Sequence, residues 1–383
     1  MLLALTSGSI AAQTVALSSN PNFIKTSILT SSPGKSPMSF SGHAALRLRC
    51  DSLHLDMVFS FENNSGGYLD QILKGSEGRV FEIETADYLE NFAKENREVK
   101  EYTLNLTLDE KARLWEVMDS LKNEPDIPFT RDVHCFTVTG EALETAVVPG
   151  FINWEESGFH GDTYGSHTRY ITTDKSPWHY FLVMLPLGDV ADIKGHGKGF
   201  IYPFIFDASY TNFKIIYPDG SEKPLVAGSP ETIVPITMQS NPAHPTPLEV
   251  SLIILGVILI ISGAQYLKHC ELCGKMLDIT LWVMITIGGI MLLIITYSPG
   301  NLGSSWNWPL LVFNPVAWVP IVFLRRQRKT VGFIYLGYGL LLACFAAFII
   351  LISPSIDTAW RVMAAALSIR CLYRANTIIN LAK

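Results

Sequence analysis

Long apolar runs without charged residues dominate the last third of this 383-residue chain. Three of them approach the ~20 residues that a helix needs to cross the hydrocarbon core of a bilayer, namely Val250–Leu267, Ile279–Tyr297 and Val331–Ser353. Pro309–Leu324 contains two prolines and predicts a kinked span. Thr358–Tyr373 is interrupted by Arg361 and Arg370, which we expect near its ends, with their side chains reaching the interface. The sequence therefore predicts an all-α domain of five transmembrane helices over residues 248–376.

The charges of the connecting loops predict how these spans are oriented. Lys268–Lys275 and Arg325–Lys329 are basic, whereas Ser298–Trp308 carries no charge and Pro354–Asp357 carries one acid. Basic loops thus fall on alternate sides, as expected when positive loops stay in the cytoplasm. This pattern places residues 1–247 outside and the C-terminus in the cytoplasm, and we expect a multi-pass protein of a bacterial inner membrane.

Overall composition hides a division between two halves of the chain. The chain has 29 basic and 35 acidic residues. Ten of the basic and four of the acidic residues lie after residue 247, so the membrane half carries a net charge of +6 and residues 1–247 carry −12. An acidic polar half joined to a basic apolar half is typical of a membrane protein with one extramembrane domain. Without a strongly basic surface in the polar half, we expect no nucleic-acid partner.

The extramembrane half reads as an α+β domain over residues 24–230. Alternating apolar residues predict strands at 46–49 and 53–61, and an apolar run predicts a buried strand at 181–187. A helix is predicted over 108–122 with Thr107 as its N-cap, and a tight turn at 218–220. The apolar start predicts a signal segment at residues 1–20, and the prolines of residues 231–247 predict a semi-rigid linker.

The six cysteines divide by predicted compartment. Cys270 and Cys273 in the first basic loop resemble half of a zinc knuckle, but no second ligand pair accompanies them, and we expect no metal or other cofactor. Cys50 and Cys135 face the oxidising side, where one alternative is a disulfide between them. The other alternative makes Cys135 a nucleophile, because the stretch that follows it can open a helix, whose N-terminus lowers a thiol pKa.

A thiol nucleophile needs a base, and His43 is the natural candidate. It follows a glycine at the start of a predicted strand, and His54 or Asp56 on the next strand could orient its imidazole. Arg47 and His134 are further supporting candidates, although His134 adjoins the cysteine and is expected to point elsewhere. Four other histidines are equally polar candidates for the base, namely His160, His167, His179 and His196.

Short motifs throughout both halves resemble one family. They are Ser27–Gly34 with Ser39–Arg47, Arg97–Val99 with Leu104–Thr107, Leu187–Asp192, Lys223–Val226, and Asn307–Leu310 with Phe313–Pro315. Their order along the chain resembles the Lnb-type N-terminal periplasmic domain followed by the Lnb membrane domain. The resemblance implies a bacterial lipoprotein N-acyltransferase with a Cys–His thiol centre, and the order of His before Cys implies a permuted papain-like fold.

The resemblance implies two site residues. The histidine of the family's Gly-His-x-x-Leu-Arg motif corresponds to His43, and the family's cysteine corresponds to Cys135. The flanks depart from the family pattern, with His134 where Asn is usual and Phe136 in place of a Thr. The implied partners are a phospholipid acyl donor and, as acceptor, the N-terminus of a diacylated lipoprotein. Two alternatives stay open: a periplasmic Cys–His peptidase or amidase of the cell envelope, and a non-catalytic assembly factor with a Cys50–Cys135 disulfide.

Overall fold

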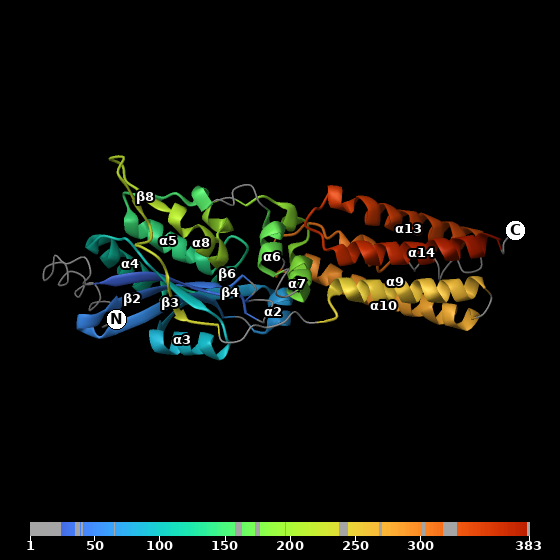
Figure 1. Ribbon diagram of the computed structural model, residues 1–383, viewed down its shortest axis with the longest axis horizontal. Helices are drawn as coiled ribbons and strands as arrows, with labels where there is room; N and C mark the ends of the chain where they lie inside the picture. Colours follow the sequence, from blue (N-terminus) through green and yellow to red (C-terminus); the bar gives the residue numbers. More distant parts are fainter. Residues whose placement is uncertain are drawn as a thin grey trace. The chain divides into compact units, whose positions relative to one another are not determined.

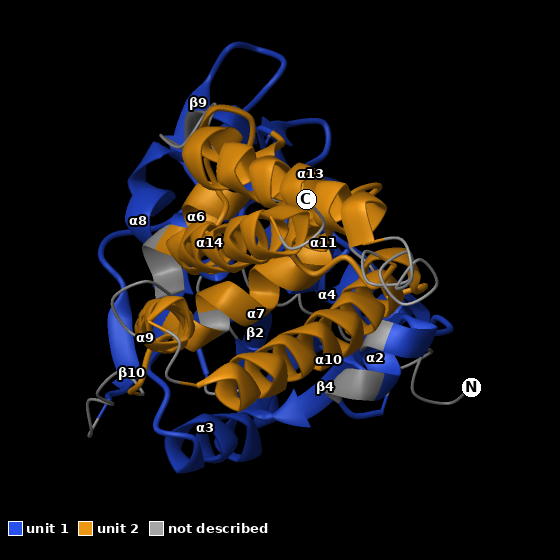
Figure 2. Ribbon diagram, turned by 90° about the vertical axis from the view of Figure 1, so that its right-hand side faces the viewer, with its two compact units in different colours: residues 1–164, 194–240 blue, residues 165–193, 241–383 orange. Residues whose placement is uncertain are grey.

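The computed structural model describes residues 24–34, 39, 41–64, 66–157, 163–172, 177–195, 197–236, 244–267, 270–300, 303–316 and 328–380. The signal segment expected at residues 1–20 lies outside them. The chain forms two compact units, which Figure 2 colours separately. Unit 1 comprises residues 1–164 and 194–240, and unit 2 comprises residues 165–193 and 241–383.

Unit 1 is built on a seven-stranded antiparallel sheet. Its strand order is β10-β5-β1-β2-β3-β4-β6. The strands are β1 (Lys25–Ser31), β2 (His43–Cys50), β3 (Leu55–Asn63), β4 (Ser76–Glu84), β5 (Val99–Thr103), β6 (Ile127–Phe129) and β10 (Glu231–Val234). A second, three-stranded sheet joins β7 (Phe151–Ile152), β8 (Lys214–Ile216) and β9 (Glu222–Pro224), with Gly220 (φ 83°) in the predicted turn between β8 and β9.

Helices cover both faces of the large sheet (Figure 1). On one face lies α3 (Thr85–Lys94), and on the other lie α4 (Leu108–Leu121), α5 (Cys135–Val147) and α8 (Pro203–Ser209); α2 (Tyr68–Lys74) connects β3 to β4. On the α3 face, Ala45 and Val58 pack with Tyr88 and Phe92. The predicted α4 helix is confirmed, and its Thr107 N-cap forms a reciprocal capping box with Glu110.

Unit 2 is helical. Its helices are α6 (Tyr164–Thr172), which starts at the unit boundary, α7 (Pro177–Leu187), α9 (Pro247–Tyr266), α10 (Glu271–Tyr297), the short α11 (Pro309–Val312), α13 (Arg328–Phe348) and α14 (Thr358–Asn380). Among the described residues, four helices are long and apolar enough to cross a membrane, and these are α9, α10, α13 with its 3₁₀ extension to Leu351, and α14. The predicted Pro309–Leu324 span begins with α11, and most of its remainder lies outside the described residues.

Three sequence predictions need correction. Residues 181–187 belong to α7 and form no strand, because an apolar run of this length fits a buried helix as well as a strand. The predicted linker at 231–247 begins with strand β10, which pairs with β5 at the sheet edge. Arg370 lies in the middle of α14 and is buried, so only Arg361 stands near a helix end.

Candidate active site

Cys135 is the first residue of α5, and its neighbour His134 caps that helix. The His134 Nδ1 accepts the backbone N–H of Phe136 at 3.3 Å, while Nε2 lies 3.2 Å from the Gly199 carbonyl and donates to it. The His134 ring also stacks on Tyr202, with 4.9 Å between centroids. Burial lowers the pKa of His134 to about 4, so the ring is neutral and both of its nitrogens are engaged. His134 therefore positions the helix start and has no free nitrogen to act as a base.

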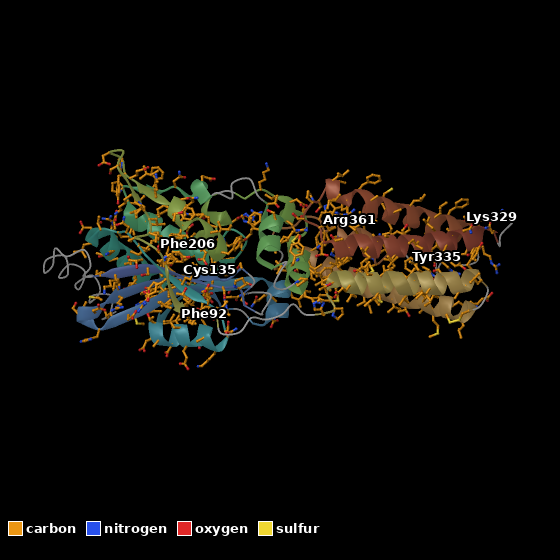
Figure 3. All side chains as sticks on the ribbon, viewed as in Figure 1. Phe92, Cys135, Phe206, Lys329, Tyr335 and Arg361 are labelled. Carbon is orange, nitrogen blue, oxygen red and sulfur yellow. A yellow bond between two sulfur atoms is a disulfide. The ribbon has the colours of Figure 1, made fainter. Side chains whose placement is uncertain are left out.

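The thiol of Cys135 is buried at the point where α5 meets β2. Backbone N–H groups of Ala44 and Phe136 donate hydrogen bonds to its sulfur, which favours the thiolate. Burial outweighs them and raises the pKa of Cys135 to about 11. Figure 3 shows Cys135 between Phe206 and Phe92, which lie on opposite faces of the sheet. The resting residue is thus a protonated thiol whose sulfur is already surrounded by amide donors.

His43 opens β2 one residue before Ala44, so the strand brings its backbone beside the thiol. Gly42 precedes it with φ at 81°, and a Cβ there would lie 2.3 Å from the Ser31 carbonyl oxygen, so the turn requires glycine. The His43 ring stacks on Phe92 at 6.3 Å. Burial and then the charge of Arg97 lower the pKa of His43 to about 3, which keeps the imidazole neutral.

A chain of hydrogen bonds runs from this imidazole to a hydroxyl and a carboxylate on β3. The His43 Nε2 lies 2.7 Å from the Ser60 Oγ, and that hydroxyl donates to the Glu62 Oε1 at 2.9 Å. Because the single Ser60 proton goes to Glu62, Ser60 accepts from the Nε2–H of His43. The Nδ1 of His43 is then the nitrogen that carries a lone pair. Burial raises the pKa of Glu62.

The residues predicted from the sequence to orient the His43 imidazole, namely Arg47, His54 and Asp56, lie elsewhere on the same hairpin. Arg47 donates to both oxygens of Asp56, at 2.8 and 2.7 Å, and to Glu101 at 2.9 Å. These contacts tie β2 to β3 and β5. His54 is exposed, with φ at 53°, in the turn at the opposite end of the β2–β3 hairpin from His43. The antiparallel register explains the difference, since it pairs Asp56 with Arg49 and brings Ser60 to the start of β2.

Two further residues of this site, Tyr88 and Arg97, were not among the site residues predicted from the sequence, although Arg97 lies in one of the family motifs. Tyr88 on α3 is 2% exposed, and its hydroxyl has no hydrogen-bond partner among the residues that the structure describes. Burial raises the pKa of Tyr88, and interactions with Glu62 and Cys135 act in the same direction, so the phenol stays protonated. Arg97 is 6% exposed and packs 4.6 Å over the Phe92 ring while bonding Ser31 and Ser32. Both come from segments far from Cys135 in the sequence, so their relation to the site was not predicted.

The remaining cysteines and histidines are also placed. Cys50 and Cys135 are both free thiols, and Cys50 ends β2 whereas Cys135 lies against its beginning. Six residues of strand separate the two contact points by roughly 20 Å, far beyond the reach of a disulfide. The Cys50–Cys135 disulfide is therefore wrong. Cys270 and Cys273 form a disulfide with each other.

The other candidate histidines are not brought to the thiol by any described contact. His167 is buried in α6. His160 and His196 lie outside the described residues, as does the side chain of His179.

Comparison with known families identifies both halves of the chain. The Lnb N-terminal periplasmic domain matches residues 12–170, and the Lnb transmembrane domain matches residues 239–381. The chain belongs to the Lnb family. The first match contains His43, Ser60, Glu62, Tyr88 and Cys135, so this cluster lies in the periplasmic domain of an Lnb-family membrane protein. No curated protein and no solved structure matches the chain significantly.

Proposed function

We propose that this protein is a lipoprotein N-acyltransferase that works through a thioester on Cys135. The observation that carries the proposal is the buried Cys135 thiol at the start of α5, hydrogen-bonded by the amide next to His43. Membership of the Lnb family is consistent with a lipoprotein-modifying enzyme. Apolar helices in the same chain would keep such a site close to lipid substrates.

The resting protonation states define the first half-reaction. His43 takes the thiol proton on Nδ1 as the Cys135 sulfur attacks the ester carbonyl of a phospholipid. The tetrahedral oxyanion collapses, the C–O bond breaks, and the protonated imidazole returns the proton to the departing lyso-lipid hydroxyl. An acyl thioester on Cys135 remains. The neutral imidazole and neutral thiol make this a proton-coupled attack, unlike the preformed ion pair of many thiol enzymes.

The second half-reaction consumes the thioester. The free α-amine of a diacylated lipoprotein attacks the thioester carbonyl, His43 removes the amine proton, and the C–S bond breaks. The proton passes to the sulfur, which restores the thiol, and an amide is formed. Ser60 and Glu62 hold the imidazole tautomer in both steps. Burial of the site limits access of water, which would otherwise hydrolyse the thioester.

The proposal also includes an arrangement in the membrane. The periplasmic domain adopts a permuted papain-like arrangement, with His43 preceding Cys135. The membrane domain crosses the bacterial inner membrane five times, with Pro309–Leu324 as a span in addition to the four long helices, and the C-terminus is cytoplasmic. Green fluorescent protein fused to the C-terminus tests this orientation, because it fluoresces in the cytoplasm and stays dark when exported unfolded to the periplasm.

Substitution of the two central residues tests the function. We expect Cys135→Ser and His43→Ala each to abolish N-acylation of a reporter lipoprotein in a strain that lacks its own acyltransferase. The measurement is the mass of the reporter's N-terminal lipopeptide. Cys50→Ser and His54→Ala are matched controls, because both residues lie in the same hairpin but away from the thiol. A persistent N-acyl mass with Cys135→Ser would refute the assignment, and cleavage of envelope peptides would favour the peptidase.

A further inference from the structure

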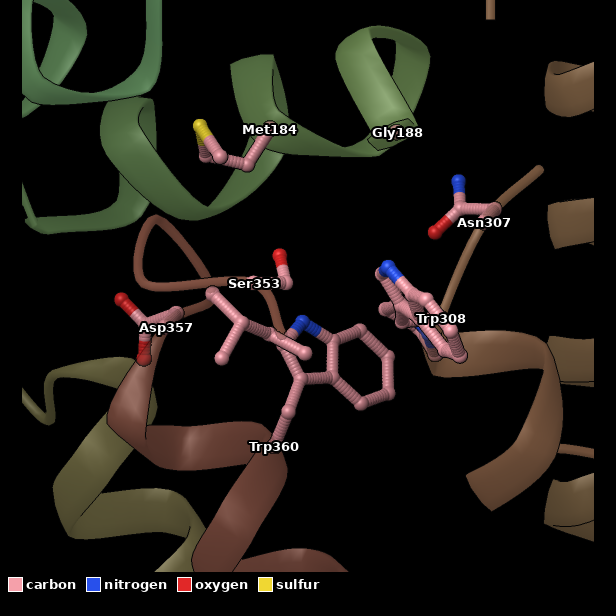
Figure 4. Close-up of a pocket in the computed structure, with 9 residues that line it drawn as sticks. Met184, Gly188, Asn307, Trp308, Ser353, Asp357 and Trp360 are labelled. Atoms are coloured by element: carbon pink, nitrogen blue, oxygen red, sulfur yellow. The ribbon is translucent and has the colours of Figure 1, made fainter. Parts of the chain in front are cut away.

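Unit 2 holds a small pocket and a disulfide that have no part in the proposed acyl transfer. The pocket lies beside Trp308 and Trp360 (Figure 4) and encloses about 20 Å³, which admits a water molecule and no larger ligand. The disulfide joins Cys270 and Cys273 at the start of α10. Of these two features, the disulfide carries reactive chemistry.

The position of each cysteine at the helix start gives its sulfur a different role. Cys270 is the N-cap of α10, and its sulfur accepts the backbone N–H of Cys273 at 3.3 Å. A helix N-terminus stabilises a thiolate, because the amide N–H groups and the helix dipole both favour negative charge there. Cys273 is exposed whereas Cys270 is half-buried, so an incoming thiolate reaches the Cys273 sulfur more easily. Attack at Cys273 then releases Cys270 as the stabilised thiolate.

Contacts other than the disulfide hold the backbone that brings the two cysteines together. Gly274 is buried next to Cys273, and its carbonyl accepts a hydrogen bond from the Arg370 Nη2 at 2.9 Å. The same guanidinium donates to Gln265 on α9 at 2.7 Å, and the absence of a side chain on Gly274 leaves room for the Gln265 amide. A disulfide between residues three positions apart also gains little from loop closure. The disulfide can therefore open and close while the start of α10 stays in place.

The predicted topology places this pair in a reducing compartment. Lys268–Lys275 is the first basic loop and is expected in the cytoplasm. Thiols there are kept reduced, and the disulfides that do form are usually transient, catalytic or redox-sensing. A structural zinc site needs four ligands, and the described residues contain no group of three or more that could hold a metal ion. The pair is thus suited to redox exchange.

We propose that Cys270 and Cys273 form a thiol–disulfide exchange site for a cytoplasmic dithiol. A thiolate of the dithiol attacks the Cys273 sulfur, the Cys270–Cys273 bond breaks, and Cys270 leaves as a thiolate that takes up a proton. The second thiolate of the dithiol then attacks the dithiol sulfur of this mixed disulfide, and Cys273 leaves in the same way. Two electrons pass to the pair, and the dithiol becomes a disulfide. The reverse steps oxidise the pair.

Redox titration of the full chain in nanodiscs tests the exchange. The protein is equilibrated with mixtures of reduced and oxidised dithiothreitol, quenched with acid, unfolded and labelled with N-ethylmaleimide. Mass spectrometry then counts the labels on the tryptic peptide of residues 269–275, which contains both cysteines. We expect two labels at the reducing end and none at the oxidising end, with one transition that is the same in both directions. Cys50 and Cys344 are free thiols and serve as internal controls that keep one label each.

A single substitution tests whether the second cysteine resolves the mixed disulfide. The reduced protein is exposed to oxidised glutathione. In Cys270→Ser we expect glutathione to remain attached to Cys273, because the thiol that would displace it is absent. In the wild-type chain the glutathione is lost as the Cys270–Cys273 disulfide closes. Persistent glutathione on Cys273 of the wild-type chain overturns the proposal.

The state of the pair in cells completes the test. We expect it to be reduced during growth, to form the disulfide when cells receive the thiol oxidant diamide, and to recover after its removal. A disulfide that persists in growing cells or in excess dithiothreitol overturns the proposal, as does zinc that copurifies with the chain and is lost in Cys270→Ser. The proposal uses the orientation of the spans but not the acyl transfer. The fluorescent fusion reports that orientation in the same cells, and none of these measurements involves Cys135.

Discussion

Cys135 and His43 are both held in their neutral forms by burial, and this determines how the thiol reacts. With its pKa at about 11, Cys135 carries little thiolate at neutral pH. We expect its alkylation by iodoacetamide to rise about tenfold per pH unit between pH 7 and 10, whereas a cysteine of ordinary pKa, about 8.5, levels off. Mass spectrometry of the Cys135 peptide follows the reaction, with Cys135→Ser as the blank. A rate that is already constant at pH 7 would show a preformed thiolate instead.

Tyr88 offers the clearest single-residue test of catalysis. Its protonated hydroxyl, which has no hydrogen-bond partner in the described part of the chain, suits the stabilisation of a developing oxyanion. We expect Tyr88→Phe to slow formation of the acyl-enzyme about 10²-fold, the usual effect of removing one oxyanion donor. Folding stability should be retained, because the Tyr88 hydroxyl makes no hydrogen bond to the residues that the structure describes. Single-turnover thioester formation and thermal unfolding measure the two effects.

Tyr102→Phe is the matched control for this experiment. Tyr102 is also buried at the large sheet, but its hydroxyl already donates to Asp207 at 2.8 Å. Its loss should reduce stability and leave the rate of thioester formation unchanged. An unaltered rate in Tyr88→Phe would exclude the tyrosine from catalysis.

At the scale of elements, the β2–β3 hairpin orients the imidazole through Ser60 and Glu62. We expect Glu62→Ala to lower kcat at least about tenfold, part of the 10²–10⁴-fold that a general base contributes, with KM unchanged. Glu62→Gln keeps an acceptor for the Ser60 hydroxyl and should recover most of the rate. Equal losses in both variants would show that charge, and not the hydrogen-bond chain, matters. Steady-state kinetics with a lipopeptide acceptor distinguish these outcomes.

At the scale of the whole molecule, one buried arginine joins three membrane helices. From α14, Arg370 bonds Asp278 at 2.6 Å on α10, and Ser262 at 2.9 Å and Gln265 at 2.7 Å on α9. It is 3% exposed, and its removal deprives Ser262 and Gln265 of their bonds to it and leaves Asp278 with Arg374, at 3.0 Å, as its remaining ion-pair partner. We expect Arg370→Met to destabilise the protein by about 3 kcal/mol or more, the lower end for breaking a buried ion pair.

Unfolding of the detergent-solubilised full chain measures this loss. Arg361→Met is the matched control, because Arg361 lies near the start of α14 and its Nε makes one bond to the Ala346 carbonyl. The control should change stability little. If both substitutions have the same effect, the Arg370 network does not hold the helices together.

The amino-acid sequence by itself determined the features that depend on neighbouring residues. Apolar length predicted four spans that the structure confirms as long apolar helices, and the Thr107 capping signal predicted α4. The expected helix after Cys135 places that residue at an N-terminus, as α5 shows. These patterns are local because helix periodicity and capping act within one or two turns.

Only the tertiary structure decided what surrounds the reactive groups. The register of β2 against β3 selected Ser60 in place of Asp56 as the partner of His43, a difference of four residues along one strand. Packing buried Tyr88 against Ala45 and Phe92 and placed Arg370 inside the helical unit, and it made residues 181–187 a helix. Such contacts join residues far apart in the chain, and their free energy depends on burial that no local pattern specifies.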